Sequence, residues 1–317
     1  MHNVFENITE DMNTTAAEAI ADIGSSVATI ASSASLVDMS ISQWQARKKD
    51  KRASNEVAYA NNAETGVANV TKALLSDSRE LGAVHKMTSA IRVFHMDMTF
   101  PWGKHNLLPS EMYADYHGGI TERFQQWQAR VDEFLGSYEY DLANMHVLAD
   151  KMGTLFNPEE YPTVDEVSRK FTYRLGYYPV PQDDWRIQTA QDGLDQMRAG
   201  FNDYVDNNLK GLYDNVYKRL LVPLQRASEK LDYTDSEKAE GTHKFTFRDT
   251  IVSNLLDMAQ IMEQVNYGDD PELKRVRQRL EDALDGVTPD VLRDDEATRL
   301  ATKRNIDDII NNLPSLM

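Results

Sequence analysis

The sequence predicts a mainly α protein, an elongated multi-helix body that carries a small β-ribbon. Over most of the chain, apolar residues recur at spacings of three and four, which is the period of a helix with one buried face. Only a few short segments alternate between apolar and polar residues as strands do. The 317 residues are 41% hydrophobic and 27% charged, a mix typical of a globular protein.

The N-terminal half contains the strongest helical signal. Residues 1–35 are rich in Ala, Ser and Thr, and we expect them to be mobile or weakly helical because little apolar surface anchors them. Residues 36–44 alternate as a short strand, and residues 56–98 follow a helical pattern that Pro101 ends. The next helix begins near Ser110, where the apolar spacings are 3, 4, 3 and 4: Phe124, Trp127, Val131, Phe134 and Tyr138.

The C-terminal half is also predicted to be helical. Thr163 and Glu166 have the spacing of a capping box. The apolar pattern then predicts a long helix that contains Pro223, followed by shorter helices, at residues 184–231, 249–267, 271–285 and from Pro289 onward. Two short stretches, 170–175 and 244–248, have the composition of strands.

These elements suggest three regions along the chain. They are an N-terminal segment (1–35), a main helical body with short strands (36–231) and a C-terminal helical region that completes the ribbon (232–317). The chain has no cysteine, which suits a reducing cytosol. The first basic residue is Arg47, and no stretch is long and apolar enough to span a bilayer, so we expect neither a signal peptide nor a membrane segment.

No catalytic or metal-binding motif is present in the sequence. The glycine-rich nucleotide loops, the HExxH motif and the GxSxG elbow are all missing. The seven histidines do not pair at metal-ligand spacing. We therefore expect a protein that is not an enzyme and that needs no cofactor and no metal.

The net charge of −17 is unevenly distributed along the chain. Residues 41–105 carry a net charge of +4, whereas residues 1–40, 106–228 and 229–317 carry −6, −7 and −8. The total argues against a protein that coats duplex DNA by bulk attraction. A local cationic region can still bind an anion, because salt screens the distant acidic residues.

One candidate binding site is the basic run that begins three residues after Trp44. It consists of Arg47, Lys48, Lys49, Lys51 and Arg52, with Asp50 between them. Five cations so close together repel one another, which favours either a bound polyanion or a fully solvated helix start. In the first case, we expect Trp44 to stack on a nucleic-acid base.

A second candidate is a pentapeptide of lysine, phenylalanine, threonine, an aromatic residue and arginine that occurs twice. The two copies span Lys170–Arg174 and Lys244–Arg248. If they pair as strands, the cations lie on one face and the aromatic side chains on the other. We expect the aromatic face to be buried and the four cations (Lys170, Arg174, Lys244 and Arg248) to face outward, although an open aromatic face that stacks bases is the alternative.

The block from Trp44 to Leu231 resembles an uncharacterised family of bacteriophage proteins. The matching features are the tryptophan before the basic run, Phe100-Pro101-Trp102 with Leu107-Leu108-Pro109, Tyr161-Pro162, Lys170-Phe171, and Pro179-Val180-Pro181 leading to Asp184-Trp185-Arg186. The whole chain also resembles the single-stranded-DNA-binding RNA polymerase cofactors of lytic podophages. That resemblance implies a transcription cofactor that recruits a phage RNA polymerase to melted promoters in the cytoplasm of the infected bacterial host.

The sequence thus leads to two alternative functions. In the first, the chain binds single-stranded DNA without base-specific readout and contacts a phage RNA polymerase, with its basic and aromatic residues as the DNA site. In the second, it is an assembly or adaptor protein that acts through helical faces, as a homo-oligomer or with other proteins, and binds no nucleic acid. The acidic total, the long helices and the acidic and apolar C-terminal stretch 306–317 support the second alternative.

Overall fold

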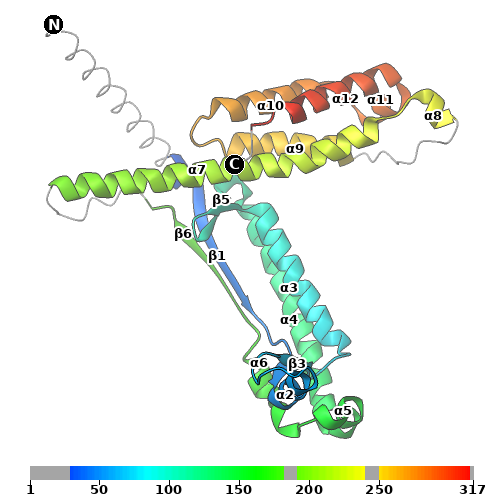
Figure 1. Cartoon of the computed structure of the whole chain (residues 1–317). Helices are drawn as coiled ribbons and strands as arrows, with labels where there is room; N and C mark the ends of the chain where they lie inside the picture. The colour runs from blue at the N-terminus through cyan, green and yellow to red at the C-terminus, as the bar shows by residue number, and fades with distance from the viewer. Residues whose placement is uncertain (1–28, 182–190, 240–249, 315–317) are drawn as a thin grey trace. The chain divides into compact units, whose positions relative to one another are not determined.

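The computed structural model describes residues 29–181, 191–239 and 250–314, and it is mainly α with small antiparallel sheets, as the sequence predicts. Figure 1 shows the long helices and the strands that accompany them. No helix within these ranges is both long and apolar enough to cross a membrane.

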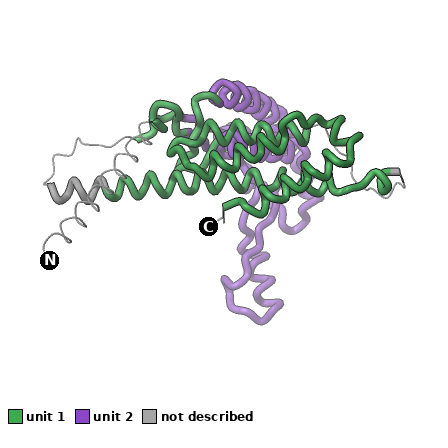
Figure 2. Tube along the Cα trace, turned by 90° about the horizontal axis from the view of Figure 1, so that it is seen from above, with its two compact units in different colours: residues 1–36, 99–111, 177–317 green, residues 37–98, 112–176 purple. Residues whose placement is uncertain are grey.

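The chain divides into two compact units that interleave along the sequence (Figure 2). Unit 1 comprises residues 1–36, 99–111 and 177–317, and unit 2 comprises residues 37–98 and 112–176. These units do not coincide with the three regions expected from the sequence, because the body 36–231 contributes to both of them. Composition separates the units as well: unit 2 has 15 Lys and Arg against 18 Asp and Glu, whereas unit 1 has 19 against 33.

Unit 2 is built around a pair of helices that run side by side (Figure 1), α3 (Arg79–Met98) and α4 (Tyr113–Ala143). All five residues of the predicted apolar stripe on α4 are buried, which confirms that prediction. The remaining elements of unit 2 are β2 (Arg47–Asp50), α2 (Lys51–Ala60), β3 (Val70–Ala73), α5 (Met145–Met152), the 3₁₀ turns η2 (Gly153–Leu155) and η3 (Pro158–Glu160), and α6 (Val164–Ser168).

Unit 1 contains the longest helix, α7 (Gln191–Leu231), which continues through Pro223. The other elements of unit 1 are β4 (Phe100–Trp102), β5 (His105–Pro109), the 3₁₀ turn η1 (Ser110–Met112), α8 (Asp235–Ala239), α9 (Thr250–Gln264), α10 (Pro271–Leu284), α11 (Pro289–Asp294) and α12 (Glu296–Asn311). Ile306 and Ile309 are buried, so the helical part of the C-terminal stretch packs on its own unit.

Two further strands, β1 (Ala34–Ser42) and β6 (Thr172–Pro179), begin in one unit and end in the other. The larger sheet has the strand order β4-β5-β1-β6, and β2 and β3 form a separate antiparallel pair.

One helix predicted from the sequence is wrong. Residues 56–98 do not form one helix: α2 ends at Ala60, β3 follows, and α3 begins only at Arg79. The chain turns where Asn62 has φ of 52° and Gly66 has φ of 99°, conformations that interrupt a right-handed helix.

Candidate nucleic-acid interface

The basic run forms β2 and the start of α2, and strand geometry divides its cations between two faces. In the antiparallel register, Lys48 lies opposite Lys72, and Lys49 lies opposite Thr71. Because successive side chains on a strand point to opposite faces, Lys48 shares a face with Lys72. Arg47 and Lys49 occupy the other face, where all four side chains of the two strands are exposed.

Lys72 is buried, with 6% of its side chain exposed, and its charge is neutralised inside unit 2. Its ammonium lies 3.0 Å from a carboxylate oxygen of Asp50 and 2.7 Å from one of Glu160, and it donates a 2.6 Å hydrogen bond to the Leu155 carbonyl. Burial acts to lower the pKa of Lys72, but hydrogen bonds to Glu160 and Asp50 outweigh it and raise the pKa. This ionic cluster ties β2, β3 and η3 together.

Helix α2 begins directly after β2, capped by Asp50. The Asp50 carboxylate accepts a 3.0 Å hydrogen bond from the Ala53 amide, and this bond, followed by the contact with Lys72, lowers the pKa of Asp50. Lys51 and Arg52 therefore occupy the first helical turn. This position agrees with the second alternative for the basic run, an exposed helix start. Arg52 pairs with Glu56 at 3.0 Å on an exposed surface, an interaction that contributes little to stability.

An open groove of unit 2 brings Lys48 and Lys170 together. It is lined by Lys48, Arg169 and Lys170, by the carboxylates of Glu159, Glu160 and Glu166, and by Pro162. The sequence prediction misses Arg169, although its position next to Lys170 is a signal for it. Two segments far apart in the sequence thus supply cations to the same groove.

Local capping positions the wall of this groove. The Asn157 side chain accepts a 3.1 Å hydrogen bond from the Glu159 amide at the start of η3. At α6, Thr163 and Glu166 form the predicted capping box, in which the Glu166 carboxylate accepts a 2.8 Å hydrogen bond from the Thr163 amide. The chain then turns so that the Lys170 amide donates to the Val167 carbonyl at 3.0 Å. These bonds set where Arg169 and Lys170 enter the groove.

The structure corrects the expectation that Trp44 stacks on a base. The residue is only 8% exposed, and its ring packs edge-on against Tyr138 at a centroid distance of 5.2 Å and beside Phe134 at 6.2 Å. The Lys170 ammonium lies 5.6 Å from the Trp44 ring centroid, within range of a cation–π contact. Trp44 therefore supports the groove from the core of unit 2 and offers no open face.

The first pentapeptide is a strand only in part, because β6 begins at Thr172, after Lys170 and Phe171. Phe171 is buried between Trp127 and Phe134 of α4, at centroid distances of 6.2 and 5.7 Å. Tyr173 also faces α4 and stacks on Phe124 at 3.9 Å, but it stays 49% exposed, so the aromatic face is only partly buried. Arg174 is exposed and forms a 2.6 Å ion pair with Asp38.

The second pentapeptide, with Lys244 and Arg248, lies outside the described residues, so the proposed pairing of the two copies stays a prediction. Within the described residues, the strand beside β6 is β1.

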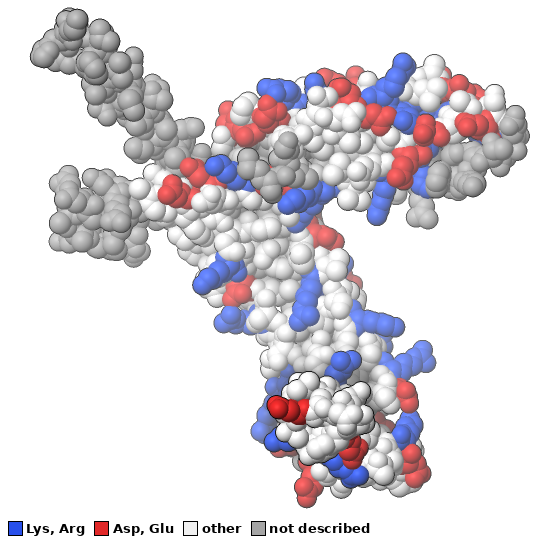
Figure 3. Space-filling view, in the orientation of Figure 1, with Lys and Arg blue, Asp and Glu red and all other residues white. Residues whose placement is uncertain are grey.

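Six exposed cations near the groove and the basic run have no carboxylate within 4 Å in the part of the chain that the structure describes. They are Arg47, Lys48, Lys49, Lys51, Arg169 and Lys170. Figure 3 shows Lys and Arg side chains over the visible face of unit 2, interspersed with Asp and Glu. The unpaired cations can therefore bind external anions without first breaking an internal ion pair.

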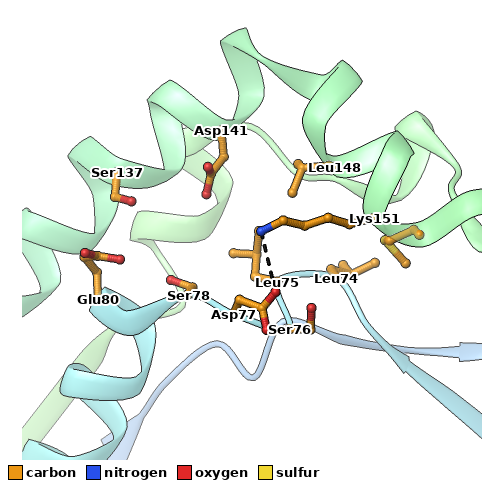
Figure 4. Close-up of a pocket in the computed structure, with 11 residues that line it drawn as sticks. Leu74, Leu75, Ser76, Asp77, Ser78, Glu80, Ser137, Asp141, Leu148 and Lys151 are labelled. Carbon is orange, nitrogen blue, oxygen red and sulfur yellow. Dashed lines mark ion pairs between the residues drawn. The ribbon is translucent and has the colours of Figure 1, made fainter.

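A second pocket of unit 2 has the opposite character. Asp77, Glu80 and Asp141 line it together with apolar side chains, and Lys151 reaches to within 3.5 Å of the Asp77 carboxylate (Figure 4). Burial raises the pKa of Asp141, and the nearby Glu80 carboxylate raises it further, while Lys151 acts in the opposite direction. This lining repels phosphates, so the pocket is not a candidate site for a polyanion. No group of three His, Asp or Glu in the described ranges could hold a metal ion.

Comparison with known proteins gives no further guide: no protein-family model, curated protein or solved structure matches this chain.

Proposed function

We propose that the protein binds single-stranded DNA through its sugar-phosphate backbone, without base-specific readout, and acts as a cofactor that recruits a phage RNA polymerase to melted promoters. The observation that carries the DNA-binding part is the convergence of Lys48, Arg169 and Lys170 on one groove of unit 2. The polymerase part rests on the resemblance to podophage cofactors that the sequence suggests.

The distribution of charge supports unit 2 as the DNA-binding unit. It contains a nearly balanced set of charges, whereas unit 1 has 33 acidic side chains against 19 basic ones. When Lys and Arg side chains neutralise phosphates, the counterions condensed on the DNA are released, and this release favours binding. The effect depends on the cations near the DNA and not on the net charge of the whole protein. Unit 1 has the larger excess of acidic residues, so we assign its described helices to the contact with the polymerase.

Binding without base readout follows from the kinds of side chain in the site. The unpaired residues are Lys and Arg on β2, on the first turn of α2 and at the end of α6, and these side chains suit contacts with phosphates. Tyr173 follows Lys170 by three residues and has a half-exposed ring, and stacking on such a ring tolerates any base.

Titration of the full chain with fluorescent oligonucleotides, followed by anisotropy, tests the DNA-binding part. We expect single strands of about 30 nucleotides to bind at low salt, with an affinity that falls as salt rises. No binding at low salt would remove the proposal. A polymerase that gains no affinity for melted promoter DNA in the presence of the protein would remove the recruitment part alone.

A further inference from the structure

The groove that contains the three cations also contains three carboxylates, which differ in whether a neighbouring group binds them. Glu160 is held by the buried Lys72 at 2.7 Å, and Glu166 accepts the hydrogen bond from Thr163 in the capping box. The Glu159 side chain is exposed and has no hydrogen-bond or ion-pair partner among the described residues. Glu159 is thus the one groove carboxylate within the described residues whose charge no neighbour engages.

The backbone of Glu159 is held in place by its surroundings. It belongs to the short turn η3, which Asn157 caps at one end. The next residue, Glu160, is tied to Lys72, and the buried Tyr161 donates a 3.0 Å hydrogen bond to the Leu74 carbonyl. The anchored backbone of this turn keeps the Glu159 carboxylate within side-chain reach of the groove.

A negative charge beside a cationic groove affects single and double strands differently. A single strand can place its phosphates on the cations and turn the rest of its flexible backbone away from the carboxylate. A duplex is stiff and carries one negative charge per about 1.7 Å of axis, twice the linear density of one strand, so its second strand cannot avoid a nearby anion. Repulsion between like charges therefore weakens binding of the disfavoured ligand more than it changes the affinity for the preferred one.

We propose that Glu159 is a specificity-determining residue that disfavours double-stranded DNA in this groove. The inference rests on the proposed DNA-binding function and adds to it the means by which single strands are selected. Glu159 thus contributes selection, while Lys48, Arg169 and Lys170 supply the attraction.

The test compares the full-length protein with its Glu159→Gln variant on a single strand of about 30 nucleotides and on the duplex of the same sequence. We expect the Kd for the duplex to fall about twofold to fivefold, the effect of one exposed charge interaction. The Kd for the single strand should change less than about twofold, so the ratio of the two constants shifts toward the duplex. Glu139→Gln is the matched control, because Glu139 is an exposed carboxylate of unit 2 outside the groove.

The outcomes separate this inference from the proposed function. If the unmodified protein binds no single strand, the proposed function fails and the inference fails with it. If the unmodified protein binds single strands but Glu159→Gln leaves the ratio of the two constants unchanged, the function stands and the inference is wrong. An equal shift of the ratio in Glu139→Gln also overturns it, because the effect would then reflect net charge alone.

Discussion

Lys48 and Lys72 lie directly opposite each other across the β2–β3 pair, yet one is exposed and the other is buried in an ionic cluster. Like charges at directly opposed positions destabilise a sheet, because the side chains start about 5 Å apart. Asp50 and Glu160 engage the Lys72 ammonium and offset that repulsion. Lys48 keeps its charge free for the groove, so a structural cation and a candidate binding cation occupy the same cross-strand pair.

Replacing Lys72 should therefore lower the stability of the protein. Lys72→Met removes the cation that compensates Asp50 and Glu160, whose side chains are only 12% and 15% exposed. We expect a loss of about 3 kcal/mol in the free energy of unfolding, the low end for breaking a buried ion pair. Urea denaturation measures it. Lys48→Met is the matched control and should stay within about 0.5 kcal/mol of the original protein; equal losses in both variants would contradict the assignment.

The groove cations should act on DNA binding and not on folding. Lys48→Ala combined with Lys170→Ala should leave the melting temperature nearly unchanged and weaken binding of single strands. The dependence of log K on log salt should flatten by roughly 0.7 for each phosphate that the variant no longer neutralises. Anisotropy titrations at several salt concentrations give this slope, and a slope equal to that of the unmodified protein would mean that the two lysines are only solvated.

The two aromatic residues of the first pentapeptide should behave differently. Phe171→Ala empties a buried site against α4 and should cost about 3–5 kcal/mol of stability, the range for large core aromatics. Tyr173→Ala should cost less stability, since the ring is half exposed, but should weaken single-strand binding by about 1–3 kcal/mol if the ring stacks on bases. Calorimetry and anisotropy on both variants separate the effects, and unaltered DNA binding by Tyr173→Ala would leave Tyr173 a packing residue only.

Acid should destabilise unit 2 through the capping box at α6. Hydrogen bonds from the Thr163 amide and hydroxyl lower the pKa of Glu166 below its ordinary value of 4.5. A group whose pKa is lower in the folded state stabilises the fold above its unfolded pKa, and that contribution is lost as the pH falls through the folded pKa. We expect the stability to fall below about pH 4.5, and to fall less steeply in Glu166→Gln. Identical pH profiles of the two proteins would show that Glu166 has no such role.

The sequence identifies well those elements whose signal is local. The apolar stripe of α4 has regular helical spacing, and the capping box at Thr163 depends on residues three apart, so both were predictable. The division of 56–98 into α2, β3 and α3 was missed because the apolar pattern outweighed turn signals such as Gly66. The β2–β3 pair joins residues that lie 20 to 26 positions apart, and such distant pairing produces no periodic pattern in the sequence.

The candidate site was predictable only in part for the same reason. The basic run and the first pentapeptide were visible as composition, but their meeting in one groove is a tertiary feature. Nothing near Lys72 in the sequence indicates that it is buried, since its partner Glu160 lies far along the chain. The position of Trp44 just before the cations suggests base stacking, whereas its large apolar ring packs in the core.

The last prediction concerns Arg299 of α12, which is fully buried in unit 1. Its guanidinium donates hydrogen bonds to the carbonyls of Tyr233 and Leu292, each at 3.1 Å, and to Asp235 at 2.7 Å. It also lies over the Tyr233 ring at 3.9 Å, so one side chain joins α12 to the chain before α8 and to α11.

Arg299→Lys should destabilise the protein even though it keeps the charge, because an ammonium cannot reproduce the planar fork of donors. We expect a loss of at least about 2 kcal/mol in the free energy of unfolding, because each buried carbonyl that loses its hydrogen-bond donor destabilises the fold by about 1–3 kcal/mol. Arg304→Lys, on the exposed side of the same helix, is the matched control and should change little. Urea denaturation that ranks the two variants equally would show that the buried guanidinium does not hold the C-terminal helices together.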